Sequence, residues 1–306
     1  MTQIDKGKIL RIGIDLGGTK IEGIALAEDS DVLYRDRIAA PTGNYHETLT
    51  AVVSLVTIIE KKIGCHGTVG IGVPGNISTK TGLIKNANST WLIGKPLEED
   101  LARQLQRPIK LANDADCFVL SESTDGAAAG QKCVFGAILG TGVGGGFYIN
   151  GTLQTGANRI RGEWGHNRLY IADDPIPPKC YCGQTGCVET YLSGPGLSRA
   201  YNQLTGANLA AKQINDAARA GDARAETVLR QYEDRLALAL STVINVMDPN
   251  AIVLGGGLSN LQRLYKNVKI KLEPYVFSDT VETALLPPKF GDSSGVRGAA
   301  WLWPKS

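Results

Sequence analysis

The 306-residue sequence has no long apolar run and almost no excess of charge of either sign. Its longest hydrophobic stretches fall well short of the roughly 20 residues that span a bilayer. The first ten residues carry charges where a signal peptide requires an apolar segment. The 32 Lys and Arg side chains nearly balance 30 Asp and Glu, which leaves a net charge of +2. These absences predict a soluble, cytoplasmic protein with no nucleic-acid or membrane partner.

Two common nucleotide-binding patterns are also missing or incomplete. The pattern G-x-x-x-x-G-K-[ST] does not occur, which excludes a Walker-type ATPase. Gly140, Gly142 and Gly145 do satisfy G-x-G-x-x-G. However, the residues that follow, FYINGTL, predict a strand ending in an Asn-Gly turn, whereas a dinucleotide site requires a helix there. A nucleotide site in this chain must therefore be of another kind.

The composition that remains is that of a globular protein with room for two domains of ordinary size. The chain is 43% hydrophobic and 20% charged. Residues 9–26 form two apolar-rich runs broken by Gly17-Gly18, which is the signal of a hairpin with a glycine turn. Residues 136–149 align on 13–26 without gaps and match glycine or leucine at four positions, which suggests an internal repeat.

Strand-like and helix-like segments alternate in both halves of the chain. The first half predicts β, β, β, α, β, α, β, α, with helices over 44–63 and 97–105. The second half predicts helices near 194–204, 208–220 and 222–247, then a strand at 251–254 and a final helix. We therefore predict an α/β protein of two domains facing each other across a cleft. Residues 1–115, completed by a C-terminal helix at about 292–306, form the first domain, and 116–291 form the second.

Three glycine-rich segments can hold phosphate groups, because glycine lets backbone N–H groups approach an anion without a Cβ in the way. The first segment adds a hydroxyl and an ammonium group, and the third lies between a strand and the start of a helix. The candidate residues are Gly17, Gly18, Thr19 and Lys20; Gly140, Thr141 and Gly142; and Gly256 and Gly257. Glycine turns without a ligand are common, and that alternative stays open for each segment taken alone.

Two aspartates stand near these segments in the predicted fold. A carboxylate beside phosphate requires a cation between them, so Asp15 indicates Mg²⁺ held through water, unless it only caps the turn. Asp114 ends a strand and begins a helix, where it can be an N-cap. If phosphate is bound nearby, Asp114 can instead accept the proton of an attacking hydroxyl that Asn113 orients. A capping carboxylate is a weak base, which a loose phosphoryl transition state tolerates.

Three of the six cysteines crowd into eight positions, an arrangement that suits a metal better than a disulfide framework. Cys180, Cys182 and Cys187 offer three thiolates, and the glycines between them let the chain turn back on itself. A tetrahedral site requires a fourth ligand, and His166 is the nearest of the three histidines. The spacing predicts a structural zinc site, with redox chemistry or free thiols as the alternatives. Cys65, Cys117 and Cys133 are scattered and are interpreted as small core residues.

At these residues the chain resembles the ROK family (repressors, open reading frames and sugar kinases). The resemblance covers nearly the whole chain and rests on DLGGTK at 15–20, LANDAD at 111–116, LGTGVGGG at 139–146, GEWGH at 162–166, the cysteine segment at 180–189 and VLGGGLSN at 253–260. It implies the two-domain fold of the actin and hexokinase ATPases, which is ribonuclease H-like. It also implies a homodimer and a cleft that closes on sugar.

The resemblance assigns a role to each group of candidate residues, and the protein is expected to be an ATP-dependent hexose kinase. It implies ATP phosphate contacts at Gly17, Gly18, Thr19, Thr141 and Gly142, nucleoside contacts near Gly256 and Gly257, Asp114 as the base, and sugar contacts from Asn113, Glu163, His166 and Glu189. It implies zinc bound by His166, Cys180, Cys182 and Cys187. His166 would then meet the metal through one ring nitrogen and the sugar through the other, so that the metal sets the orientation of the imidazole.

Within the family, the segments KNANSTWL at 85–92 and EWGHN at 163–167, with the ending GDSSGVRGAAWLWP, resemble the bacterial fructokinases, also called manno(fructo)kinases. Fructose is therefore the expected hexose, with Asn88 among its contacts and mannose as a second substrate. A kinase acting on N-acetylglucosamine or another hexosamine is the alternative. The loop at 168–179 matches neither group. A repressor or silent sugar sensor is a remote alternative, because DLGGTK begins at residue 15 and leaves no room for a winged helix, and because both aspartates are present.

Overall fold

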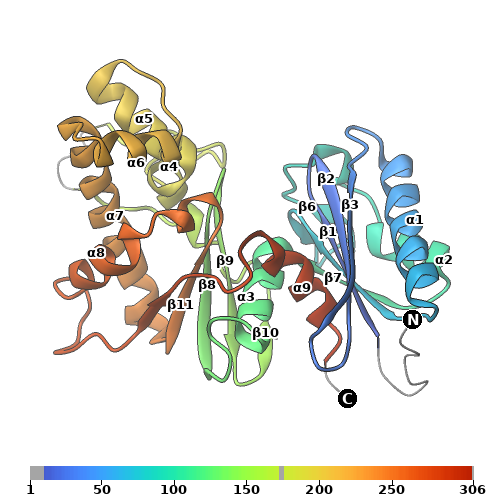
Figure 1. The fold of residues 1–306 in the computed structure, drawn as a ribbon. Coiled ribbons are helices and arrows are strands. Elements are labelled where there is room, and N and C mark those ends of the chain that lie inside the picture. The colour runs from blue at the N-terminus through green and yellow to red at the C-terminus, as the bar shows by residue number, and fades with distance from the viewer. Residues whose placement is uncertain (1–9, 172–175, 305–306) are drawn as a thin grey trace. The chain divides into compact units, whose positions relative to one another are not determined.

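The computed structural model describes residues 10–171 and 176–304 of the chain (Figure 1). Residues 172–175 of the loop at 168–179, and the first nine residues used above to argue against a signal peptide, lie outside the described residues. The chain divides into two compact units. Unit 1 comprises Met1–Ala129, Thr155–Arg161 and Asp292–Ser306, and unit 2 comprises Gly130–Gln154 and Gly162–Gly291. Unit 1 extends beyond residue 115, where the first domain was expected to end, and that domain division stays a prediction.

Unit 1 is built on a five-stranded sheet of order β3-β2-β1-β4-β7. Its strands are β1 (Arg11–Leu16), β2 (Lys20–Leu26), β3 (Val32–Ala39), β4 (Thr68–Val73) and β7 (Ile109–Asn113). The first three strands form an antiparallel meander, and β4 and β7 continue the sheet in parallel with β1. A separate two-stranded ribbon joins β5 (Asn76–Ile77) to β6 (Ile84–Lys85). The expected glycine hairpin at 9–26 is confirmed by the pairing of β1 with β2.

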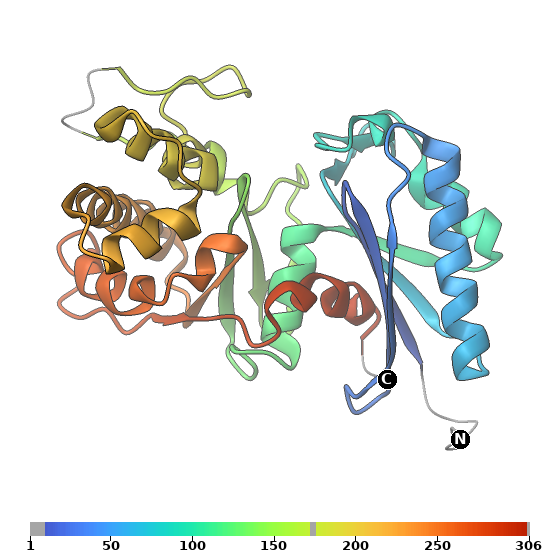
Figure 2. The same cartoon turned by 45° about the horizontal axis from the view of Figure 1, so that its top comes forward.

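Helices cover both faces of this sheet (Figures 1 and 2). On one face lie α1 (Tyr45–Ile63) and α2 (Leu97–Leu105), and on the other lie α3 (Asp114–Thr124) and α9 (Ser294–Trp301). Glycines allow this close packing: a Cβ on Gly13 or Gly70 would collide with backbone oxygens of α9, and one on Gly23 would press on Leu55 and Ile59 of α1. The C-terminal helix therefore completes the fold of unit 1.

Local sequence sets the ends of α1. The Asn44 side chain accepts a hydrogen bond from the Glu47 N–H, which satisfies one of the free donors of the first turn. Gly64 ends the helix in the left-handed conformation at φ 83°, where a Cβ would be strained. The helix expected over 44–63 is confirmed, because its caps and its apolar spacing indicate the same boundaries.

Unit 2 repeats the strand pattern of unit 1, with the order β10-β9-β8-β11-β12. Its strands are β8 (Cys133–Leu139), β9 (Val143–Ile149), β10 (Thr152–Gln154), β11 (Ala251–Gly255) and β12 (Ala284–Leu286). Again three strands form an antiparallel meander and two continue it in parallel. The Asn150-Gly151 turn between β9 and β10 has φ values of 49° and 81°, as expected for a tight hairpin. The repeat suggested by the alignment of 13–26 with 136–149 is therefore present in the fold.

The core of unit 2 forms around one long helix. The helices are α4 (Val188–Leu192), α5 (Gly194–Thr205), α6 (Ala211–Arg219), α7 (Ala223–Met247) and α8 (Arg263–Leu272), and α7 packs against all the others. Short 3-10 helices occur at η1 (Thr90–Leu92), η2 (Trp164–His166), η3 (Gly257–Asn260) and η4 (Gly291–Ser293). The sequence did not predict these, nor β5, β6 and β12, because such short elements carry too little periodicity. Among the described residues, every helix is too short or too polar to cross a bilayer.

Candidate functional site

The turn between β1 and β2 presents the first glycine segment. The Gly17 N–H donates to the Lys20 carbonyl at 3.0 Å and closes the turn. Gly18 lies between them, and Thr19 and Lys20 are exposed. This geometry leaves the Thr19 hydroxyl and the Lys20 ammonium group at the surface of the turn, as a phosphate site requires.

Asp15 lies on β1 two residues before this turn and is partly buried. Burial, together with the negative charges of Asp114 and Glu22, raises the pKa of Asp15 to about 7. A Cβ built on Gly295 would lie 3.4 Å from Asp15 Oδ2, so the start of α9 stands directly beside the carboxylate. A divalent cation would relieve the repulsion between these like charges.

Asp114 is exposed at the first position of α3. Asn113, not Asp114, is the N-cap, because its side-chain oxygen accepts from the Ala115 N–H at 2.9 Å. The other end of its amide donates to the Gly75 carbonyl at 2.9 Å. The Asp114 Oδ1 also accepts from the Ala115 N–H, at 2.8 Å. The interpretation of Asp114 as the N-cap is therefore wrong by one residue. Asn113 caps the helix, and both its side-chain oxygen and its side-chain nitrogen form hydrogen bonds.

Ser89 is a residue that the sequence did not single out. It is buried, and its Oγ has no hydrogen-bond partner within the part of the chain that the structure describes. That hydroxyl lies 3.6 Å from the place where a Cβ on Gly18 would stand. The neighbouring Asn88, expected to contact sugar, is exposed. Buried hydroxyls nearly always form a hydrogen bond. The absence of a partner for the Ser89 hydroxyl among the described residues is therefore unusual, and this hydroxyl lies beside the first glycine segment.

The loop between β8 and β9 presents the second glycine segment in unit 2. The Gly140 N–H donates to the Gly142 carbonyl at 2.9 Å, and the Gly140 carbonyl accepts from the Gly194 N–H at 2.8 Å. Glu189 reaches the same loop from α4, where its Oε2 accepts from the Val143 N–H at 2.9 Å. A Cβ on Gly142 would lie only 2.7 Å from that oxygen. The loop and Glu189 therefore pack as one piece, with Thr141 exposed between them.

The segment carrying Glu163 and His166 is fixed against β9. The Trp164 indole N–H donates to the Gly144 carbonyl at 2.7 Å. A Cβ on Gly162 or Gly165 would collide with backbone oxygens of β9, so both positions require glycine. This packing explains the motif GEWGH: its glycines and tryptophan position the two polar side chains, which both remain partly exposed.

The third glycine segment follows β11. Gly256 has φ 77° and a Cβ there would lie 2.5 Å from the Leu139 carbonyl oxygen, so the chain turns tightly against the end of β8. Gly257 begins the 3-10 helix η3, where the sequence indicated the start of a longer helix. Both glycines are exposed, and the open space at Gly257 leaves its backbone accessible to a ligand.

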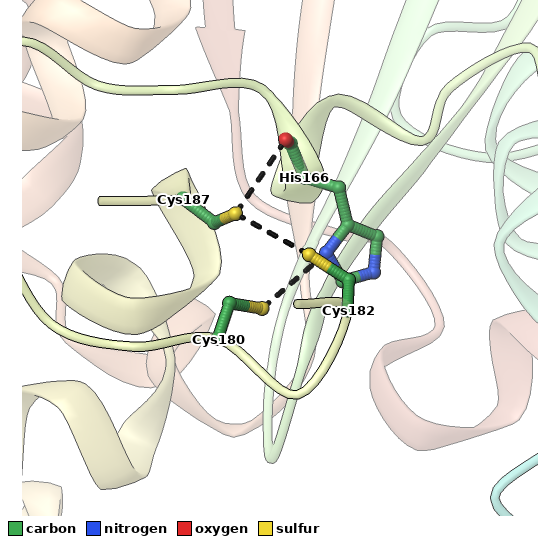
Figure 3. Close-up of side chains that lie close together, drawn as sticks. All are labelled: His166, Cys180, Cys182 and Cys187. Atoms are coloured by element: carbon green, nitrogen blue, oxygen red, sulfur yellow. Dashed lines mark hydrogen bonds between the residues drawn. The ribbon is translucent and has the colours of Figure 1, made fainter. Parts of the chain in front are cut away.

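Four side chains of unit 2 form a cluster with metal-ligand chemistry (Figure 3). One ligand atom from each of His166, Cys180, Cys182 and Cys187 lies within 4.8 Å of the others. Cys182 Sγ is 3.6 Å from Cys187 Sγ, and Cys180 Sγ is 3.7 Å from His166 Nδ1. A zinc ion with Zn–S bonds of about 2.3 Å would place tetrahedral ligand atoms roughly 3.8 Å apart. The cluster therefore fits a four-coordinate zinc ion.

Tyr181, between two of these cysteines, was not singled out from the sequence. Its phenol oxygen lies 3.1 Å from His166 Nε2, and the two rings meet edge to face. Although Tyr181 is largely exposed, desolvation of its hydroxyl beside His166 and the charges of Glu189, Cys180 and Glu163 together raise the pKa of Tyr181 to about 12. The residue that Tyr181 contacts, His166, is one of the sugar contacts expected from the family resemblance.

The structure thus assembles the predicted residues in two groups. Unit 1 brings together Asp15, the turn at 17–20 and Asp114. Unit 2 brings together the loop at 140–142, Glu163, His166, Glu189 and the cysteines. A tyrosine flanked by two predicted metal ligands was the signal that could have directed attention to Tyr181, whereas nothing in the sequence marked Ser89.

The ROK family model matches residues 11–306, and the chain therefore belongs to the ROK family. It is 40% identical over 302 residues to an N-acetyl-D-glucosamine kinase of Haemophilus influenzae, covering 95% of this chain and 98% of the relative.

Two solved structures confirm the predicted fold class, an α/β fold shared with the actin-like sugar kinases. A ROK hexokinase from Thermus thermophilus superposes with a TM-score of 0.85 at 26% identity and covers 95% of this chain and 97% of that one. A ROK family glucokinase from Streptomyces griseus, in complex with glucose and AMPPNP, has a TM-score of 0.79 at 27% identity and covers 96% and 98%.

The comparisons overturn the expectation that the hexose is fructose. Curated relatives that align over 95% of this chain are N-acetyl-D-glucosamine kinases, at 37% to 40% identity. The fructokinase assignment is therefore wrong, and the comparisons favour the alternative. The segments used for it lie between β6 and η1, in the segment that carries His166, and in α9 with its flanking residues. Selectivity between hexoses depends on pocket contacts that differ by only about 1–3 kcal/mol, and those contacts have no motif.

Proposed function

We propose that this protein transfers the γ-phosphoryl group of ATP to a hydroxyl of N-acetyl-D-glucosamine. For the sugar, the observation that carries the proposal is the alignment over nearly the full chain with kinases of that name. For the chemistry, it is the exposed Asp114 carboxylate, which follows β7 at the same end of the sheet as Asp15, because Asp15 pairs with Gly72 and Gly72 pairs with Ala112. One carboxylate can act as base while the other lies beside a cation.

Asp114 is the proposed base. The attacking hydroxyl gives its proton to the Asp114 carboxylate while its oxygen bonds to the γ-phosphorus and ADP leaves. Because phosphoryl transfer passes through a loose transition state, the proton can leave late and the base need not be strong. Asn113, fixed by Gly75 and Ala115, holds Asp114 at the start of α3.

We propose that the glycine turns bind the phosphates of ATP and that Mg²⁺ lies beside them. Asp15 would hold Mg²⁺ through water, and the ion would supply charge neutralisation of the phosphates. The proposed phosphate contacts are Gly17, Gly18, Thr19, Lys20, Gly140, Thr141 and Gly142, and the nucleoside contacts are Gly256 and Gly257. The proposed sugar contacts are Asn88, Asn113, Glu163, His166 and Glu189.

Zinc would be bound by His166, Cys180, Cys182 and Cys187, whose spacing supports a closed tetrahedral site. With four protein ligands the metal leaves no position for water, so its contribution would be structural. Through Cys187, the N-terminal cap of α4, the ion would help to position Glu189 two residues later. Through His166 it would orient an imidazole beside the sugar contacts.

A kinetic comparison of hexoses tests the proposal. ADP release is measured with Mg-ATP and N-acetylglucosamine, N-acetylmannosamine, glucose, mannose or fructose. We expect the highest kcat/KM for N-acetylglucosamine. A higher value for another hexose would keep the phosphoryl transfer and change the substrate, and no turnover on any hexose would contradict the kinase assignment.

The base is tested by Asp114→Asn, which keeps the shape of the side chain and removes its proton affinity. We expect kcat to fall by about 10²–10⁴-fold with a smaller change in the KM for sugar. Asp29→Asn, the same change at an exposed turn aspartate of unit 1, is the matched control and should retain full activity. Equal kcat values for the two variants would refute the role of Asp114.

A further inference from the structure

Tyr181 is the most exposed aromatic residue near the candidate sugar contacts. Its side chain is 84% exposed, although it is flanked by two cysteines of the cluster. Apolar packing therefore does little to hold the ring. The contacts that orient it are its hydroxyl on His166 Nε2, at 3.1 Å, and the edge-to-face stacking of the two rings, with centroids 5.3 Å apart.

The two nitrogens of His166 face different partners. Nδ1 lies on the side of the cysteines, 3.7 Å from Cys180 Sγ (Figure 3). Nε2 is therefore the nitrogen left for anything outside the cluster. A neutral imidazole that binds a metal through one nitrogen carries its single proton on the other. His166 then has one N–H to give, and in this structure the Tyr181 oxygen lies 3.1 Å from the nitrogen that would carry it.

A sugar hydroxyl and the Tyr181 hydroxyl cannot both accept this one proton in good geometry. We infer that Tyr181 is a positioning residue that occupies His166 Nε2–H in the sugar-free protein and is displaced when a hexose hydroxyl takes its place. Tyr181 thereby keeps the imidazole oriented before sugar arrives and lowers the affinity for the hexose. This inference rests on the proposed function, in which His166 contacts the sugar.

The position of Tyr181 suits such an exchange. Its hydroxyl oxygen lies 3.1 Å from His166 Nε2, so it stands beside a nitrogen that the proposed function assigns to sugar binding. The high exposure of the ring means that little buried surface is lost when it swings outward. The main cost of displacement is one neutral hydrogen bond, worth about 1 kcal/mol.

The test is the affinity for N-acetylglucosamine, measured by calorimetry without ATP, in Tyr181→Phe. The variant keeps the ring and removes the acceptor. We expect the Kd to fall about fivefold, the counterpart of one hydrogen bond that no longer has to be broken. The KM for the sugar should fall in parallel while kcat stays unchanged. Tyr170→Phe, at a tyrosine that is 76% exposed on the adjoining loop, is the matched control and should bind like wild type.

Two further measurements separate competition from a structural effect. Zinc content and melting temperature should equal those of wild type in Tyr181→Phe. Tyr181→Ala, which also removes the ring, should bind sugar at least as tightly as wild type. An unchanged or weaker Kd in Tyr181→Phe, or a weaker Kd in Tyr181→Ala, would overturn the inference.

The failure of this inference can be told apart from that of the proposed function. If wild type phosphorylates N-acetylglucosamine but Tyr181→Phe binds it with an unchanged Kd, only the role of Tyr181 is refuted. If wild type binds none of the hexoses in the kinetic comparison, the proposed function and the inference are both refuted.

Discussion

The two glycine hairpins of this protein share one backbone design but differ in where their carboxylate comes from. In unit 1, Asp15 is part of strand β1 itself. In the gapless alignment of the two hairpins the position of Asp15 corresponds to Ile138 on β8. Unit 2 instead receives Glu189 from α4, and its carboxylate accepts from the Val143 N–H of the loop. The carboxylate of the first hairpin therefore belongs to its own strand, whereas the carboxylate at the second hairpin comes from a helix that packs against it.

This difference teaches that a repeated fold does not imply a repeated chemistry. A carboxylate in a strand is raised in pKa by burial and by neighbouring acids, which suits a cation. A carboxylate that accepts a hydrogen bond from a loop N–H, as Glu189 does from Val143, helps to hold the loop in one conformation. We expect changes at the first to act on catalysis, and changes at the second to act on sugar binding and stability.

The largest effect should come from the charge that only the first hairpin carries. Asp15→Asn removes the proposed Mg²⁺ partner, and we expect kcat/KM with Mg-ATP to fall about 100-fold or more. The steady-state rate over a range of Mg²⁺ concentrations checks this. Glu28→Gln, at a side chain just past the end of β2, is a control that should keep the wild-type rate. A variant with nearly full activity would mean that Asp15 only shapes the turn.

The same substitution tests the raised pKa of Asp15. The pKa in the folded protein, about 7, is above the value of about 4 in an unfolded chain, so protonation favours the folded state. In the absence of Mg²⁺, wild-type stability should fall as pH rises from about 4 to about 7, by roughly 1–4 kcal/mol, and stay level above that. In Asp15→Asn, the free energy of unfolding measured with denaturant should not show this fall between about pH 4 and 7. Identical pH profiles for wild type and Asp15→Asn would contradict a raised pKa at Asp15.

A second, smaller effect should come from the metal cluster, because zinc would influence the second hairpin through Glu189 and would not influence the first. Cys187 caps α4 just before Glu189, whereas none of the four cluster residues belongs to the first hairpin. Removal of zinc by a chelator, or Cys182→Ser, should weaken hexose binding about 10–100-fold, because the ligands orient their neighbours. Added zinc should restore the chelated protein, and Cys65→Ser should behave as wild type. A metal-free protein with unaltered Kd for hexose would refute this role.

The smallest effect should appear when one methyl group is added to each hairpin. In Gly142→Ala the new Cβ would lie 2.7 Å from Glu189 Oε2, so the carboxylate must move and its bond to Val143 weakens. We expect a loss of about 1–2 kcal/mol in the free energy of unfolding and a several-fold higher KM for sugar. In Gly18→Ala the nearest atom is Ser89 Oγ at 3.6 Å, an ordinary contact, so stability should change by less than about 0.5 kcal/mol. Equal losses in denaturant unfolding would remove the distinction between the hairpins.

Much of the fold could be predicted because its signals are local. The glycine turn after β1, the caps of α1 and the Asn150-Gly151 turn each depend on a few consecutive residues whose backbone preferences are strong. The identity of the cap at α3 was missed by one residue, since Asn113 and Asp114 are equally good capping types and only their hydrogen bonds distinguish them. The hexose was missed because pocket contacts leave no periodic or motif signal.

The sequence by itself determined the α/β class, the two glycine hairpins and the cysteine spacing, because turns, periodicity and ligand spacing are properties of neighbouring residues. Tertiary structure alone decided that Glu189 reaches the Val143 N–H, that the Tyr181 hydroxyl meets His166 Nε2, and that Ser89 is buried beside Gly18. Each of these contacts depends on which atoms point toward one another after packing. Side-chain direction across separate elements is set by the assembled core, which no local pattern of residues encodes.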